Sequence, residues 1–179
     1  MKQITKFLKE GLKITSKTRV NEKTYHPKYK DELKELIEKL LDERGKDANL
    51  NDIDTSNITD MSNLFEFLDP HNINISQWDV SNVTNMYGMF LGCEKFTADL
   101  SKWDVSNVED MHDMFFNCYK FNSDLSAWDV SNVTNMTFMF NECKNFNSDL
   151  SKWNVSNVKN MIKMFKNCPL QKNPPKWYK

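Results

Sequence analysis

Four cysteines are the residues of this 179-residue chain whose type and spacing most directly suggest chemistry. They recur every 25 residues, as Cys93, Cys118, Cys143 and Cys168. Four-cysteine zinc sites normally contain short CxxC pairs, and this chain has none. If each thiol lies in one coil of a stack, neighbours are about 5 Å apart, a separation that a disulfide also accepts. Because cysteine packs as a small apolar residue, we predict buried free thiols, with adjacent disulfides and a metal site as the alternatives.

The remaining groups that could do chemistry do not form a recognisable catalytic set. The three histidines, His26, His71 and His112, lie in unrelated sequence contexts. A GxSxG motif, a P-loop and a GxGxxG motif are all missing from the sequence. We therefore predict a protein that is not an enzyme and that binds no cofactor.

An acidic residue also recurs once per 25 residues, and these residues could line one edge of a stack. They are Asp79, Asp104 and Asp129, with Asn154 in the fourth position. A calcium column is the alternative reading, but the glycine-rich nonapeptide of calcium-binding β-rolls is missing.

The 25-residue spacings of the cysteines and acidic residues belong to an internal repeat, and this repeat predicts the fold. The block ISQWDVSNVTNMYGMF returns three times without insertion or deletion, and a degenerate copy begins at Ile53. Residues 51–168 are therefore nearly five 25-residue units. A fixed period of this length predicts a solenoid with one coil per unit, in which each coil buries its apolar side against its neighbours. The tryptophans of the block then form a buried ladder: Trp78, Trp103, Trp128 and Trp153.

Within a unit, the apolar positions fall into three groups. FNSDLSAW predicts a short extended segment, and Ser131-Asn132 between two valines predicts a tight turn. Met136, Met139, Phe140 and Cys143 have the spacing of one to two helical turns. Each coil is thus expected to be a short strand, a turn and a short helix. The asparagines of the turns (Asn82, Asn107, Asn132 and Asn157) are expected to form a ladder that satisfies backbone groups between coils.

The unit MF-x-x-C-x-x-F-N-x-D-L-S-x-W-D-V-S-N-V-T-N-M resembles the BspA-like leucine-rich repeats of bacterial surface proteins, especially the mycoplasma type. The resemblance covers residues 51–168. It implies a right-handed leucine-rich-repeat-like solenoid that acts in binding or adhesion and has no catalytic residues.

The flanks of the array are expected to act as caps. Apolar residues at Leu33, Ile37 and Leu40 predict one helix over about 27–44 in the basic segment 1–50, ended by Gly45. Residues 169–179 form the predicted C-terminal cap, in which Trp177 and Tyr178 fold over the last coil. A short amphipathic helix is also possible within the first 20 residues.

The charge distribution limits the classes of partner. Residues 51–168 carry 16 acidic residues against 8 lysines, which disfavours binding to nucleic acid. No apolar run reaches the roughly 20 residues of a membrane span, and lysines interrupt the apolar residues near the start, so no signal peptide forms. These features predict a cytoplasmic protein without an integral membrane segment, or a surface or secreted one if an export signal was trimmed.

The candidate binding residues lie where the units differ. If the invariant positions point inward, the variable ones point outward, and they include aromatic residues, which anchor protein interfaces. These candidates are Tyr87, Phe116, Tyr119 and Phe138. We expect a protein–protein interaction module with an unidentified protein partner and an undefined oligomeric state. The alternative is a bacterial surface adhesin that recognises a host protein or glycan, and the alternative face is the extended segments around Asp99, Asp124 and Asp149.

Overall fold

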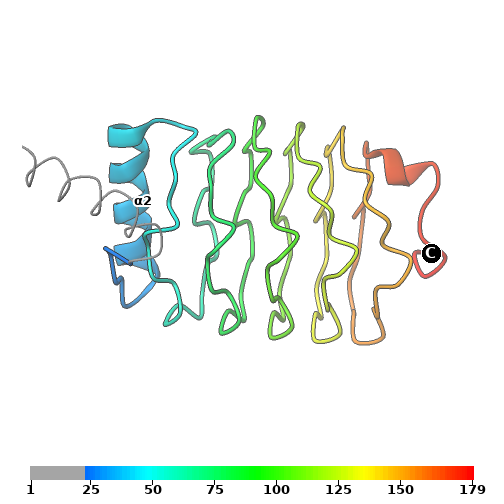
Figure 1. Cartoon of the computed structure of the whole chain (residues 1–179). Helices are drawn as coiled ribbons and strands as arrows, with labels where there is room; N and C mark the ends of the chain where they lie inside the picture. Colours follow the sequence, from blue (N-terminus) through cyan, green and yellow to red (C-terminus); the bar gives the residue numbers. More distant parts are fainter. Residues whose placement is uncertain (1–22) are drawn as a thin grey trace, which may run out of the picture.

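The computed structural model describes residues 23–179, and residues 51–168 form a stack of coils that lie side by side (Figure 1). Isolated parallel bridges join neighbouring coils at one position per unit, from Asp60 through Asn85, Asp110 and Asn135 to Asn160. Consecutive bridged residues are 25 apart, so the repeat period of the sequence is also the register of the stack. The helix considered within the first 20 residues lies outside the described part.

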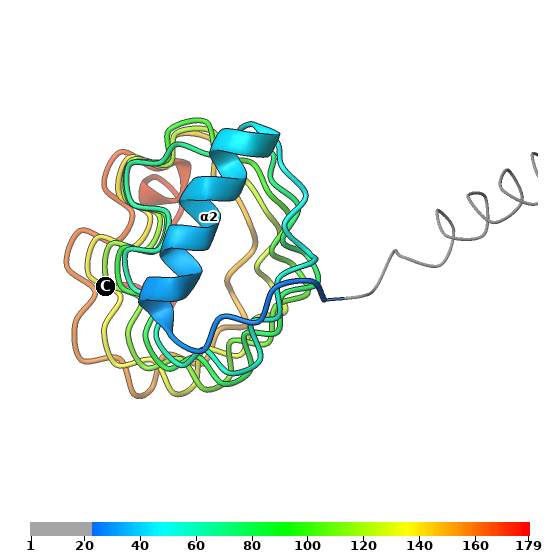
Figure 2. The same ribbon diagram turned by 90° about the vertical axis from the view of Figure 1, so that its left-hand side faces the viewer.

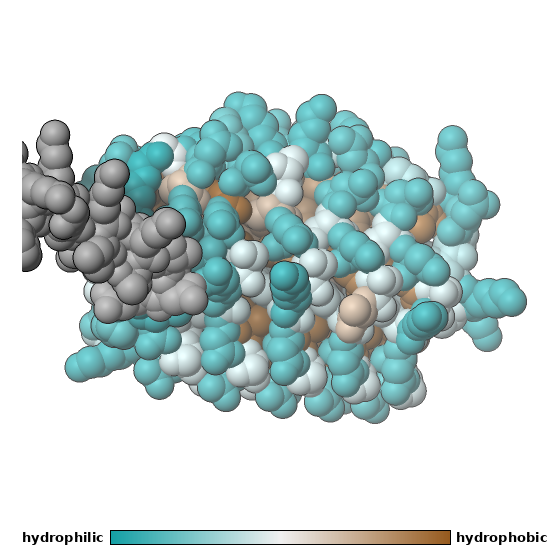
Figure 3. Space-filling model, in the orientation of Figure 1, coloured by the Kyte–Doolittle hydropathy of each residue, from teal (hydrophilic) through white to brown (hydrophobic). Residues whose placement is uncertain are grey.

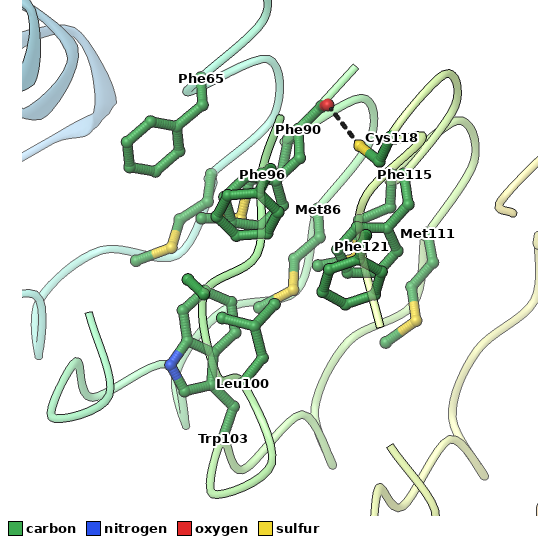
Figure 4. Close-up of a cluster of buried hydrophobic side chains, with 14 of the residues drawn as sticks. Phe65, Met86, Phe90, Phe96, Leu100, Trp103, Met111, Phe115, Cys118 and Phe121 are labelled. Carbon is green, nitrogen blue, oxygen red and sulfur yellow. Dashed lines mark hydrogen bonds between the residues drawn. The ribbon is translucent and has the colours of Figure 1, made fainter. Parts of the chain in front are cut away.

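The interior is built from columns of identical side chains (Figure 4). Phe90 stacks on Phe115 with ring centroids 5.6 Å apart, and Phe115 lies 4.1 Å from Phe121 of a second column. The four tryptophans of the repeat are only 4–5% exposed, and the indole N–H of Trp128 donates to the Leu100 carbonyl at 3.1 Å. Each coil therefore buries its aromatic rings against the next coil.

The helix α2 (Lys30–Arg44) lies across the first coil and covers the end of the core (Figure 2). It buries Leu33, Ile37, Leu40 and Leu41, and Gly45 ends it with a positive φ of 84°. The helix begins three residues after the predicted start because the chain before it is extended, with Tyr25 bridged to Ile53. Lys34 of α2 also donates to the Asn63 carbonyl of the first coil at 3.2 Å.

The segments expected to be short helices are instead runs of tight turns, which we call the turn segments: residues 61–68, 86–93, 111–118, 136–143 and 161–168. Phe138 and Glu142 have positive φ values of 54° and 63°, which a right-handed helix does not allow. Alternate N–H groups also point to the next coil, as in the 3.0 Å bond from Phe138 to the Ile162 carbonyl. Bonding between coils thus replaces the bonding of a helix.

The last coil is followed by the 3-10 helix η1 (Pro169–Gln171) and by a tail that turns back on the core (Figure 1). The Trp177 ring stacks on Trp153 with centroids 6.3 Å apart, and Tyr178 lies edge-on to Phe165 at 4.9 Å. Residues 169–178 therefore cover part of the last coil.

Within residues 23–179, no helix combines the length and the apolar character that crossing a bilayer requires.

Candidate functional site

The four thiols lie in the core as free cysteines rather than at a surface site. The thiols of Cys93, Cys118 and Cys143 donate to phenylalanine carbonyls at 3.1, 3.0 and 2.9 Å. Burial raises the pKa of all four, to about 11 for Cys168, which is nearest the end of the stack. Among the described residues, no three His, Cys, Asp or Glu side chains gather as metal ligands would.

The polar ladders bond to the backbone. Asn132 donates to the Ser106 carbonyl of the preceding coil at 2.7 Å, and each of the other turn asparagines makes the equivalent bond. Asp129 lies at the exposed edge and accepts from the Ser131 N–H at 3.0 Å. Hydrogen bonds from the Ser131 hydroxyl and N–H lower the pKa of the Asp129 carboxyl. These side chains therefore have a structural task in holding the turns.

The extended segments, the alternative binding side, border a polar groove of about 650 Å³. Asp124 and Asp149 line it together with Ser126, Ser148 and Lys152. Asp124 accepts from the Ser126 N–H at 2.9 Å and from the Ser148 hydroxyl at 3.1 Å. No aromatic side chain lines this groove, so it offers a partner mainly hydrogen-bonding groups.

The variable positions of the turn segments bring three of the four predicted aromatic residues into one cluster. The Tyr87 ring lies 5.1 Å from the His112 ring, and His112 lies 6.2 Å from Phe138 in the next coil. Phe116 meets Phe138 edge-on, also at 6.2 Å. We call Tyr87, His112, Phe116 and Phe138 the aromatic strip. It runs across three coils, and its members are half-buried rather than fully exposed.

The predicted residue Tyr119 lies apart from these rings. The Lys144 ammonium group is 4.2 Å from the centre of its ring, a cation–π contact that occupies one face of the ring. Tyr119 is thus half-buried beneath a lysine, apart from the strip.

Sequence reasoning missed His112 as the central member of the strip. Its varying position in the repeat suggested a simple surface residue, but its ring connects Tyr87 to Phe138. Its Nε2 atom is 3.1 Å from an Asp113 carboxylate oxygen. Burial raises the pKa of the Asp113 carboxyl, the His112 imidazole opposes this effect, and the negative charge of Asp110 reinforces it.

A lysine and an exposed isoleucine lie at the Phe138 end of the strip. Lys163 extends over the Phe138 ring at 5.8 Å, and Ile162 beside it is 57% exposed. Thr137, beneath this end, has a buried hydroxyl with no partner among the described residues. The strip therefore offers apolar ring faces, an imidazole and one carboxylate, which suits contact with a protein side chain better than proton transfer.

One broad face of the stack is mostly polar. Figure 3 shows one face of the stack, on which polar side chains follow the successive coils and apolar colour appears only between them.

A family model described as "Mycoplasma protein of unknown function, DUF285" matches residues 33–130 and again residues 99–178. Together the two matches cover most of α2, the whole stack of coils and nearly all of the C-terminal tail. The overlap of the two matches is expected of a repeat, since one model fits the array in two registers. No curated protein and no solved structure matches the chain.

Proposed function

The chain belongs to the family of Mycoplasma proteins of unknown function DUF285, and from its structure we propose that it is a non-enzymatic module that binds another protein through the aromatic strip. The observation that carries this proposal is the contact of Tyr87, His112 and Phe138, which come from three successive coils. Rings held in place by a rigid core lose little conformational freedom when a partner binds.

The chemistry of the strip indicates which kind of side chain the partner would place on it. Ring faces of Tyr87 and Phe138 favour an apolar or aromatic side chain, and Asp113 adds a hydrogen-bond acceptor at the centre. A partner that also donates a hydrogen bond to Asp113 would be recognised more selectively than one that only covers the rings.

The assignment of the stack to a class of repeat fold is a part of this proposal. We propose that the stack is a BspA-like leucine-rich-repeat solenoid with α2 as its N-terminal cap. Support comes from the 25-residue register of the parallel bridges and from the match to a Mycoplasma family.

A second candidate is a surface adhesin that recognises a host protein or glycan. The resemblance of the repeat to BspA-like surface proteins favours it, together with the family match. In this case the same strip is the contact surface, because aromatic rings also stack on sugars. Binding of a glycan by the purified chain would favour this second candidate.

The test is a comparison of capture by three forms of the chain. The parent chain, a strip variant (Tyr87→Ser, Phe116→Ser, Phe138→Ser) and a groove variant (Asp124→Asn, Asp149→Asn) are immobilised at equal density. Lysate of the source cells is passed over each, and retained proteins are quantified by mass spectrometry. We expect at least one protein that the parent and groove variant retain and the strip variant loses. Equal retention by all three would contradict the proposal.

A further inference from the structure

The two ends of the stack differ in charge. Residues 51–150 hold 16 acidic residues and four lysines, whereas residues 151–179 hold seven lysines and no acidic residue. Lys159, Lys163 and Lys166 of the last coil are exposed. The last coil and the tail therefore form a basic end on an acidic stack.

This end also carries an unpaired backbone edge. On its inner side, the last coil is bonded to the previous one: the Lys159 N–H donates to the Thr134 carbonyl, and the Asn160 carbonyl accepts from Met136, both at 2.8 Å. On its outer side, the Lys159 carbonyl and the N–H groups of Met161 and Lys163 have no partner in the described part of the chain. These are the groups that a further parallel segment would use.

The tail leaves this edge open while it covers the core. Gln171 accepts from the Asn167 N–H at 2.8 Å, and Trp177 covers Trp153. Beside the edge lies a groove of about 630 Å³, which residues 159–163 border on one side and Tyr178 and Lys179 on the other. The exposed side chain of Ile162 is in its wall.

A second copy of the chain is a poor occupant of the groove. Its N-terminal end is covered by α2, whose Lys30 is bonded to Asp60 and Ser62 of the first coil. Tail-to-tail contact would bring two basic ends and two rows of N–H donors together, and like charges repel. The natural occupant is therefore a different, negatively charged molecule.

We propose that the edge at residues 159–163 binds an extended acidic segment of a partner protein, which continues the parallel pairing of the stack. Carbonyl groups of the segment accept from the N–H groups of Met161 and Lys163, and one of its N–H groups donates to the Lys159 carbonyl. Its carboxylates face the exposed lysines, and an apolar side chain packs on Ile162. This surface lies at the end of the stack and extends the proposed function beyond the aromatic strip.

An anionic membrane would also be attracted to the lysines, but it would leave the unpaired backbone groups and the groove of this end without a role. Phosphate groups can pair with lysine side chains. They have no N–H group to donate to the Lys159 carbonyl, and they have no apolar group to pack on Ile162. A polypeptide supplies both partners by its backbone.

The probe for the test comes from the chain itself. A peptide with the sequence of residues 106–114, SNVEDMHDM, copies a segment that already pairs in this manner. In the stack, the carbonyls of Asp110 and His112 accept from Met86 and Gly88 at 2.9 and 2.8 Å. The control peptide carries lysine in place of its three acidic residues, at positions 109, 110 and 113.

Binding is followed on the full ¹⁵N-labelled chain by NMR titration at millimolar peptide. We expect shifts of the Met161 and Lys163 amide signals with the acidic peptide and none with the control peptide. The double variant Lys159→Glu, Lys163→Glu should weaken binding by about tenfold or more. The matched variant Lys102→Glu, Lys120→Glu changes two exposed lysines of inner coils and should leave binding unchanged.

Three outcomes would overturn the proposal. They are no shift of the two amides with the acidic peptide, equal shifts with the lysine peptide, or equal weakening in both double variants. Vesicles of phosphatidylserine and phosphatidylcholine form a separate arm. Binding of the chain to them without any shift by the acidic peptide would assign the basic end to a membrane surface instead. Thermal midpoints of all variants establish that each is folded.

Discussion

The indole N–H of Trp177 donates to the carbonyl of Leu150 at 2.8 Å. One coil earlier, Trp153 makes the same bond to Leu125 at 3.0 Å, and the two indole rings are stacked at an angle of 8°. Trp177 follows Trp153 by 24 residues rather than 25. The tail thus supplies the tryptophan of a further coil without the rest of its unit.

Replacement of this residue should loosen the last coil. In Trp177→Ala, the Trp153 ring loses its cover, and we expect a loss of about 1–3 kcal/mol in the free energy of unfolding, because Trp177 is only partly buried. Trp128→Ala, in the middle of the stack, should cost about 3–5 kcal/mol. Urea unfolding measures both losses.

Phe67→Ala is the matched control, since that ring is 70% exposed. A Trp177→Ala variant no less stable than the parent would show that the tail does not cap the core. Hydrogen exchange should locate the loss in residues 151–168 and leave the first coils protected.

The thiols should be unreactive in the folded chain. Burial raises the pKa of Cys118 and Cys143 well above that of a free cysteine, so little thiolate exists at neutral pH. We expect slow reaction with a thiol reagent in buffer and four equivalents of free thiol in denaturant without reductant. Fewer than four would indicate disulfides, and fast reaction in buffer would indicate exposed thiols. Cys168, with a pKa of about 11, should react first.

The stability of the stack should fall in acid. Hydrogen bonds from Ser101, Ser126 and Ser151 lower the pKa values of Asp99, Asp124 and Asp149. A carboxyl whose pKa is lower in the folded chain stabilises it above the unfolded pKa of about 4, and this contribution disappears as the pH falls through the folded value. The thermal midpoint should therefore decrease from about pH 5 to about pH 3.

The variant Asp99→Asn, Asp124→Asn, Asp149→Asn tests this assignment. Asn74 occupies the same position in an earlier unit, and its side-chain oxygen accepts from the Ser76 hydroxyl at 2.9 Å. The amides should therefore keep the turns while they remove the titration, so the midpoint should depend less on pH. An unchanged pH dependence would mean that other carboxylates cause the loss.

Much of the core follows from the sequence alone. The tryptophan, phenylalanine and cysteine positions repeat every 25 residues, and the structure places each set in the interior. The turn segments do not follow from apolar spacing, since Met136, Met139 and Phe140 fit a helix equally well. Gly88 and Gly92 indicated tight turns in the second unit, and they have positive φ values of 57° and 71°. The fourth unit has Phe138 and Glu142 at these positions in the same conformation, so the repeat as a whole did not show the glycine pattern.

The aromatic strip was only partly predictable. Variation between units selected Tyr87, Phe116 and Phe138, which the structure joins in one half-buried cluster, while nothing in the sequence indicated that Tyr119 lies under Lys144. The role of His112 depends on its position between the rings of two neighbouring coils. This contact depends on the distance between neighbouring coils. The identity of the variable residues does not give that distance.

The most direct test of the central claim is quantitative capture of a partner by the strip variant Tyr87→Ser, Phe116→Ser, Phe138→Ser. The partner is the protein that the parent chain retains from source-cell lysate, and binding is then measured with both components purified. We predict a thermal midpoint close to that of the parent, because the three side chains lie outside the core columns, and a loss of affinity of about tenfold or more. Full affinity in a variant with an unchanged midpoint would contradict the account.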